Sequence, residues 1–251
     1  MQKRFWLAAL VAVVLLSGSA VRAEDNFYVI AGGGGGVGTK ITSVPYTIFT
    51  PGFYYLDRNL VYSGNGNAIT IEADNVTLDL MGYSLNYTGP ANEPNGIYML
   101  GRKNVEIRNG SISGFWTGIY EASAVDGANH RVINIRADYN AVFGGIGILL
   151  TGKNHLVRDC SASNNSYYGI QIEGGTITGC VASDNGEYGI SLGGSGSLLD
   201  NVVTNTKSID TTGFEIVYTA TVLVDGNSAG GNATNYSIGG TNTVWGVNAG
   251  R

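Results

Sequence analysis

Four residues whose side chains suit sugar binding recur at one position of a repeated segment. Tyr98 and Tyr120 each follow a Gly-Ile pair, and Gln171 and Glu215 occupy the same place in later copies. Aromatic rings offer apolar area beside a polar tip, while amide and carboxylate groups bond hydroxyls. With Trp116 close to the second tyrosine, this outward row predicts a surface that binds an extended polysaccharide or cell-surface glycan. The alternative is ordinary exposed tyrosine, a residue that strands favour.

Two histidines also recur in successive copies of the repeat. His130 and His155 each follow an asparagine, so stacked copies would make the two imidazoles neighbours. Imidazole is the commonest metal-ligand side chain, but a metal site needs further ligands beside the pair. We therefore expect a solvent-exposed histidine pair, with no metal site and no cofactor.

The two cysteines, Cys160 and Cys180, share another repeat position. Strands of neighbouring coils lie about 4.8 Å apart, within the Cα separation that a disulfide tolerates, and export would permit oxidation. Both side chains leave parallel strands in the same direction, however, which does not suit the S–S dihedral. The sequence favours a stacked pair of buried thiols and leaves a disulfide as the alternative.

The elements that must position these residues are copies of one short unit. The copies are separated by 20 to 29 residues, a period typical of solenoids. Within a copy, apolar and polar residues alternate, as in Val76-Thr77-Leu78-Asp79-Leu80, which indicates strands. Three short strands per turn, stacked in parallel, predict an all-β fold, a parallel β-helix of about seven to eight coils.

Stacked copies place like residues in columns. We expect an inward column of isoleucines with Tyr168 and Tyr188 packed in the core beside it. Asparagine tolerates tight corners and can hydrogen-bond the same residue type in the next coil. A corner column after the second strand is therefore expected to contain Asn109, Asn134, Asp159 and Asn201. Residues 121–129 form the longest insertion, which solenoids place in loops.

The repeated Asn/Tyr-Gly-Ile-x-Ile/Leu and Val-x-Ile-x-Asn patterns resemble the right-handed parallel β-helix proteins of the pectin-lyase-like superfamily over about residues 41–230. The resemblance implies right-handed coils, in a superfamily that includes polysaccharide lyases, hydrolases, epimerases, phage tailspikes and copper-site maturation proteins. Its hydrolases carry carboxylates before the Gly-Ile pair, where this chain has Asn95, Thr117 and Tyr168. The Trp-x-Asp-His pattern of pectate lyases is also absent, so we assign no catalytic residue.

The N-terminal region predicts export. Residues 1–23 combine a basic start at Lys3 and Arg4 with an apolar run, as a cleaved signal peptide does. The expected location is therefore secreted or periplasmic. No later stretch predicts a membrane span. Residues 24–40 are glycine-rich and predict a tether.

Residues 41–251 form the predicted β-helix domain, with a C-terminal cap from about residue 226. A bare solenoid end would invite association between edges. We therefore expect the last coil to be closed by Tyr236, Ile238, Trp245 and Val247.

The net charge of the chain argues against nucleic acid as a partner. Loss of Lys3, Arg4 and Arg22 with the signal peptide changes the formal net charge from −5 to −8. An acidic chain without a cluster of Lys and Arg is a poor nucleic-acid binder. The leading hypothesis is glycan binding without catalysis. The alternatives are a polysaccharide-processing enzyme, lyase before hydrolase, and a purely structural surface or spacer protein; the oligomeric state stays open.

Overall fold

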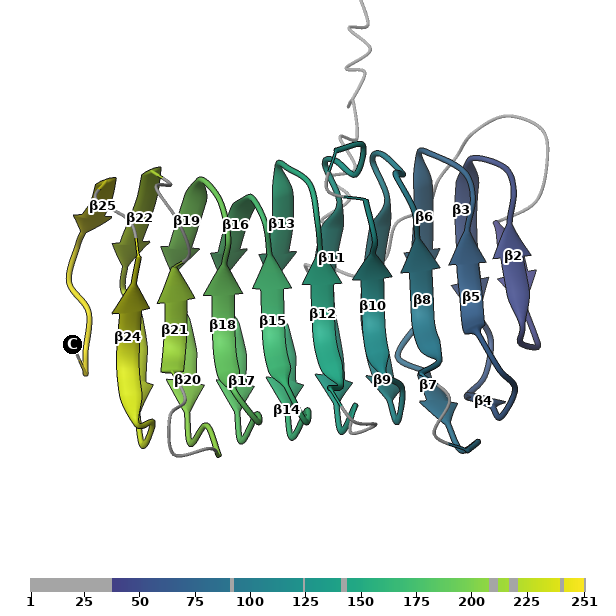
Figure 1. Cartoon of the computed structure of the whole chain (residues 1–251). Helices are drawn as coiled ribbons and strands as arrows, with labels where there is room; N and C mark the ends of the chain where they lie inside the picture. The colour runs from purple at the N-terminus through teal and green to yellow at the C-terminus, as the bar shows by residue number, and fades with distance from the viewer. Residues whose placement is uncertain are drawn as a thin grey trace, which may run out of the picture. The chain divides into compact units, whose positions relative to one another are not determined.

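A computed structural model describes residues 38–90, 93–123, 125–140, 144–207, 212–216, 221–239 and 242–250. The predicted signal peptide, and the predicted tether up to residue 37, lie outside the described residues. In the described part every regular element is a strand, and the strands stack into a parallel β-helix of about eight turns (Figure 1). The all-β prediction is confirmed.

Each coil contributes strands to three sides of the solenoid. The nine-stranded side carries the Gly-Ile segments, and we call it the Gly-Ile sheet: β2 (Tyr46–Ile48), β5 (Asn67–Ile71), β8 (Asn95–Met99), β10 (Thr117–Glu121), β12 (Ile146–Leu150), β15 (Tyr168–Ile172), β18 (Tyr188–Leu192), β21 (Thr212–Ile216) and β24 (Thr234–Ile238).

The other two sides belong to one sixteen-stranded sheet that bends at a corner, because β9 and β11 are long enough to run round it. Its longer path is β1 (Thr39–Ile41), β3 (Gly52–Leu56), β6 (Val76–Asp79), β9 (Glu106–Ser113), β11 (Arg131–Asp138), β13 (His155–Arg158), β16 (Gly175–Thr178), β19 (Gly196–Leu199), β22 (Thr221–Asp225) and β25 (Asn242–Trp245). The third side adds β4 (Leu60–Tyr62), β7 (Ser84–Tyr87), β14 (Ser161–Ser163), β17 (Val181–Ser183), β20 (Val202–Thr204) and β23 (Ser228–Gly230).

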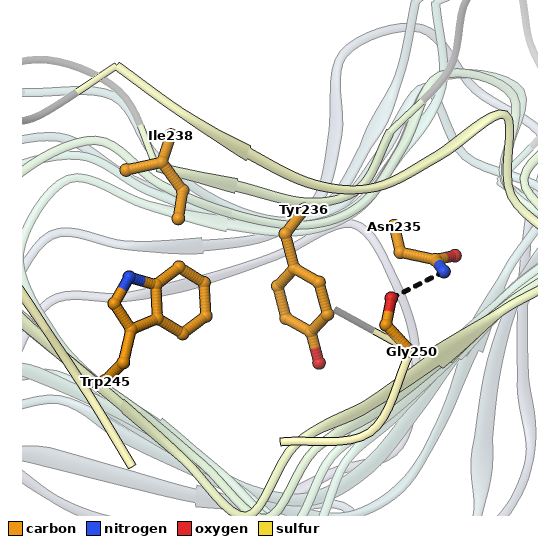
Figure 2. A pocket seen from close by; sticks show the side chains of 5 residues that line it. All are labelled: Asn235, Tyr236, Ile238, Trp245 and Gly250. Atoms are coloured by element: carbon orange, nitrogen blue, oxygen red, sulfur yellow. Dashed lines mark hydrogen bonds between the residues drawn. The ribbon is translucent and has the colours of Figure 1, made fainter. Parts of the chain in front are cut away.

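The two ends of the solenoid differ. Strand β1 already takes in Thr39 and Lys40, two residues of the predicted tether, and Ile41 behind them is buried. At the other end, Tyr236 and Trp245 pack edge to face with ring centroids 5.6 Å apart, and an open cavity remains around them (Figure 2). Val247 is 85% exposed. The prediction that Val247 helps to close the last coil is wrong, because the chain turns it away from the interior.

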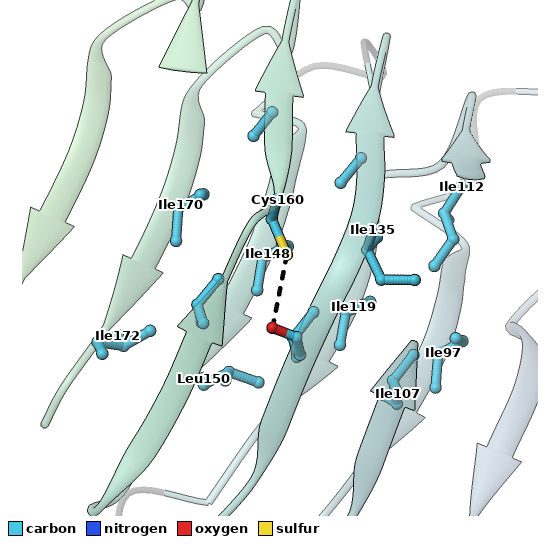
Figure 3. Close-up of a cluster of buried hydrophobic side chains, with 14 of the residues drawn as sticks. Ile97, Ile107, Ile112, Ile119, Ile135, Ile148, Leu150, Cys160, Ile170 and Ile172 are labelled. Atoms are coloured by element: carbon cyan, nitrogen blue, oxygen red, sulfur yellow. Dashed lines mark hydrogen bonds between the residues drawn. The ribbon is translucent and has the colours of Figure 1, made fainter. Parts of the chain in front are cut away.

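The interior is a stack of aliphatic side chains. Ile97, Ile119, Ile148 and Ile170 lie directly above one another in register on the Gly-Ile sheet and are fully buried. Isoleucines of β9 and β11 approach them from the opposite wall (Figure 3). Burial of one such side chain stabilises the fold by about 1.5–3 kcal/mol, so the predicted inward column makes a substantial contribution to stability.

A column of glycines allows the coils to approach at the start of the Gly-Ile strands. A Cβ added at Gly96, Gly118, Gly147 or Gly169 would lie 2.5–2.6 Å from the carbonyl oxygen of the glycine in the next coil. A contact this short forces backbone to shift, since real Cβ atoms essentially never show it. The glycine of the repeat is therefore fixed by the spacing of the coils.

Asparagine and aspartate form the corners. Asn109, Asn134 and Asp159 have positive φ angles of 52–57° after the second strand, as expected, and Asn134 Nδ2 donates to Asn109 Oδ1 at 3.1 Å. The predicted fourth member, Asn201, is wrong by one residue, because Leu198 aligns with Ile177 and so puts Asp200 in the column. Asn201 instead faces inward and is buried, where Cys180 N donates to its Oδ1 at 2.9 Å.

Candidate functional site

The residues of the predicted row form one continuous column on the outer side of the Gly-Ile sheet. Strand pairing aligns its residues one above another across β8, β10, β12, β15, β18 and β21: Tyr98, Tyr120, Leu149, Gln171, Ser191 and Glu215. Alternation sends these side chains outward because their neighbours in the strands point into the core. Six strands at about 4.8 Å spacing make a row of about 24 Å.

The aromatic end of the row is a three-ring cluster. Tyr98 and Tyr120 pack edge to face with centroids 5.7 Å apart, and Trp116 meets Tyr120 edge to face at 6.3 Å. The expected closeness of Trp116 is confirmed. The tyrosine rings are half-buried, and burial, followed by the neighbouring Tyr98 and Glu121, raises the pKa of Tyr120. The Tyr120 phenol therefore stays protonated near neutral pH and can both donate and accept hydrogen bonds.

A hollow of about 270 Å³ lies beside Tyr98. Thr70, Glu72 and Arg102 supply polar groups to its lining. The Arg102 guanidinium is held in place because it donates to the carbonyl oxygens of Glu72 and Leu100, at 3.0 Å each. The aromatic end of the row thus has a concave edge with hydroxyl, carboxylate and cationic groups within its walls.

The polar end of the row differs from the expectation. Ser191 is fully buried, and its Oγ donates to Glu215 Oε2 at 2.9 Å. Glu215 is half-buried. Burial of the Tyr188 phenol, and then the nearby charge of Glu215, raises the pKa of Tyr188 to about 12. Glu215 is therefore part of a local polar network that also includes Tyr188, which the sequence analysis placed in the core.

Tyr168 and Tyr188 are not core residues, and this prediction is wrong. Both are half-buried at the outer corner where β15 and β18 begin, with ring centroids 4.9 Å apart. Tyr167 stacks on Tyr168 at 4.0 Å. The interior at this corner is filled by Asn165 and Asn185, whose side chains hydrogen-bond at 3.0 Å. Sequence alternation missed this second aromatic cluster because the first strand residue after a corner need not follow the parity of the strand.

The histidine pair is buried, which contradicts the expected solvent-exposed pair. His130 and His155 stack with centroids 5.1 Å apart and interplanar angle 10°. Val105 N–H donates to His130 Nδ1 at 3.3 Å, which leaves the imidazole proton on Nε2 to bond Glu121 Oε2 at 3.0 Å. The prediction of an exposed pair assumed that the ring nitrogens had no hydrogen-bond partners in the protein. Glu121 and backbone groups supply those partners in the interior.

Glu121 holds the 121–129 insertion in place through several hydrogen bonds. This fully buried carboxylate also accepts the N–H groups of Gly101, Arg102 and Ser123 at 2.7–3.1 Å. Burial alone would raise the pKa of Glu121, but the hydrogen bonds from His130 and these amides outweigh that effect and lower its pKa. The fold supplies all four hydrogen-bond donors to Glu121. We call Glu121 and the stacked pair of His130 and His155 the latch, because together they fix the start of the insertion.

The cysteines form the expected stacked pair of buried thiols. Cys160 and Cys180 are both free and buried, and Cys160 N–H points at Cys180 Sγ at 3.5 Å. Burial, together with the neighbouring Cys180, raises the pKa of Cys160 well above its ordinary value. Among the described residues no group of three or more His, Cys, Asp or Glu side chains is arranged to hold a metal ion.

The comparisons with known proteins agree with the geometry. The sequence profile of the family described as right handed beta helix region matches residues 47–229, which is more than half of the chain. The protein belongs to this family, so the predicted right-handed parallel β-helix is confirmed. A comparison with curated proteins finds no match. Within the part of the chain described, no helix is long and apolar enough to cross a membrane.

Proposed function

We propose that this right-handed β-helix protein is exported and binds an extended polysaccharide or cell-surface glycan along the outer row of the Gly-Ile sheet. The observation that carries the proposal is the unbroken register of the row, which begins with the paired rings of Tyr98 and Tyr120. A linear glycan presents repeated apolar faces and hydroxyl edges. A row of about 24 Å with aromatic and polar groups at fixed spacing complements such a ligand.

The two ends of the row would make different contacts. Tyr98, Tyr120 and Trp116 supply ring area at one end. At the other end Gln171 lies next to the network of Glu215 and Tyr188, which supplies hydrogen-bonding groups. The middle position, Leu149, is apolar and half-buried, so it adds contact area without a polar requirement.

Affinity gel electrophoresis across a panel of neutral and acidic polysaccharides tests the proposal. Tyr98→Ala and Tyr120→Ala each remove one ring of an interacting pair, so each should weaken retention by about three- to tenfold. Tyr83→Ala is the matched control, because Tyr83 is an exposed tyrosine outside the row. Absence of retention for the wild-type protein, or equal retention of all three variants, would refute the proposed site.

Export has its own test. Mass spectrometry of protein recovered from the periplasm and from the medium should find a mature N-terminus near residue 24, after the Val21-Arg22-Ala23 sequence. Recovery of the protein with residues 1–23 intact in the cytosolic fraction would contradict this part of the proposal.

A further inference from the structure

Three tyrosine rings and two carboxylates gather at the outer corner where β15 and β18 begin. Tyr167 stacks on Tyr168 with ring centroids 4.0 Å apart, and Tyr188 of the next coil meets Tyr168 edge to face at 4.9 Å. Glu187 precedes Tyr188 in the chain, and its N–H donates to the carbonyl oxygen of Tyr167 at 2.9 Å. Glu215 of β21 completes the group from the following coil. We call these five residues the acidic aromatic corner.

The two carboxylates of the corner have no cationic partner among the described residues. Neither Glu187 nor Glu215 forms an ion pair there. Glu215 Oε2 accepts the Ser191 hydroxyl at 2.9 Å, whereas the carboxylate of Glu187 accepts no hydrogen bond from a described residue. Lys207, the basic residue of the following coil, donates instead to Asn164 Oδ1 at 3.1 Å. All five members of the corner are half-buried, so part of each side chain stays open to a ligand.

The sequence around the corner is strongly acidic. Residues 160–225 contain seven Asp or Glu residues and one basic residue, Lys207, and the next basic residue is Arg251. In the earlier coils, by contrast, basic side chains pair with carboxylates, as Arg108 does with Asp79 at 2.7 Å. Clustered charge of one sign sets up a potential that attracts ligands of the opposite sign. The field at this end of the outer row therefore favours a cation and repels acidic polysaccharides.

Aromatic rings beside carboxylates are surroundings that suit an ammonium group. A cation is attracted to the electron-rich face of a tyrosine ring. An ammonium group also carries three N–H donors and no acceptor, so carboxylate and phenol oxygens can both accept from it. Burial, and then the charge of Glu215, keeps the Tyr188 phenol protonated near neutral pH, because together they raise its pKa to about 12. A primary amine at the corner can therefore contact a ring and bind a carboxylate at the same time.

We propose that the acidic aromatic corner binds the ammonium groups of a polysaccharide that contains amino sugars. The proposal rests on the glycan binding proposed above and names the class of glycan. Glu215 belongs both to the corner and to the outer row, which runs in register back to Tyr120 and Tyr98. A glycan that lies along the row therefore passes the corner. The hollow beside Tyr98 does not oppose this choice, since Glu72 and Arg102 both line it.

Isothermal titration calorimetry with two matched sugars tests the proposal. A hexamer of β-1,4-linked glucosamine carries free amines, whereas its N-acetylated counterpart carries neutral amides in their place. Below the pKa of the sugar amines, the full chain should bind the glucosamine hexamer at least about tenfold more tightly, and the difference should shrink as salt is added. Polygalacturonate, a polyanion, should bind more weakly than either hexamer.

Neutral substitutions show whether the corner supplies the preference. Glu187→Gln and Glu215→Gln each remove one negative charge, and each should weaken binding of the glucosamine hexamer by about three- to tenfold while changing that of the acetylated hexamer less. Asp200→Asn is the matched control. It removes the same charge from an exposed corner between the other two sides of the solenoid, and the same left-handed conformation is taken by asparagine at Asn109 and Asn134. This control should bind both hexamers as the wild-type protein does.

The outcomes separate this inference from the proposed glycan binding. Equal affinity for the two hexamers, tighter binding of polygalacturonate, or a preference that Glu187→Gln leaves unchanged would overturn the amino-sugar assignment, while loss of binding in Tyr98→Ala and Tyr120→Ala would still support a glycan site. A protein that binds neither hexamer nor any other polysaccharide would overturn both. Oligolysine that binds as tightly as the glucosamine hexamer, with Tyr98→Ala affecting neither ligand, would show a general cation site and overturn the assignment to a glycan.

Discussion

His155 makes the stability of the fold depend on pH in a predictable direction. The ring is 2% exposed, its Nδ1 accepts the N–H of His130, and its Nε2 faces the carbonyl oxygen of Thr151 at 3.0 Å. Burial, and then the neighbouring His130, lowers the pKa of His155 to about 4. In the unfolded chain its pKa returns to about 6.5.

The direction of the pH dependence follows from the number of protons that the folded and unfolded states bind. Between pH 6.5 and about 4 the unfolded chain binds a proton at His155 that the folded protein does not. The free energy of unfolding therefore falls as the pH falls through this window and is fully present above it. The difference in pKa corresponds to about 3 kcal/mol over the whole window, of which about 2 kcal/mol is lost between pH 7 and pH 5.

Two measurements check this prediction. Urea unfolding followed by circular dichroism at pH 7, 6 and 5 should be compared for the wild-type protein and His155→Gln, in which an amide keeps one donor and one acceptor without titrating. The variant should lose about 2 kcal/mol less between pH 7 and pH 5, since all other titrating groups are shared. An NMR titration of the two imidazoles gives the pKa directly. A His155 ring that titrates near 6.5, or parallel stability profiles for both proteins, would refute the reasoning.

Two further predictions concern the core and the latch. Ile148→Ala should lower the free energy of unfolding by about 2–5 kcal/mol because it leaves a cavity in the middle of a fully buried column. Val181→Ala, at a 43% exposed position, is the control and should change the free energy of unfolding by less than about 0.5 kcal/mol. Equal effects of the two substitutions would contradict the buried column. Glu121→Gln replaces an acceptor of four hydrogen bonds by a group with one acceptor atom and should speed hydrogen exchange at the amides of Gly101, Arg102 and Ser123; unchanged exchange there would show that the carboxylate does not hold the loop.

The outer row of the Gly-Ile sheet could be predicted from the sequence because its arrangement depends only on local rules. Alternation has a period of two, and copies of one unit stack in register, so Ile148 and Ile170 must point inward and Leu149 and Gln171 outward. The same rule placed the cysteines in one column. It failed where two apolar residues adjoin: Leu198 and Leu199 fit the inward position equally well, and only strand pairing shows that Leu198 takes it.

Tertiary structure decided the features that depend on distant partners or on chain direction at corners. Histidine is buried only where its ring nitrogens find hydrogen bonds. For His130 the acceptor is Glu121, the last residue of β10, and the two lie on opposite sides of the insertion in the sequence. Tyr168 and Tyr188 lie outside because asparagines fill the interior corner beneath them. The sequence alone therefore determined the solenoid and its outer row, since repetition fixes both, while contacts between coils decided which polar groups are buried and how each end of the stack is finished.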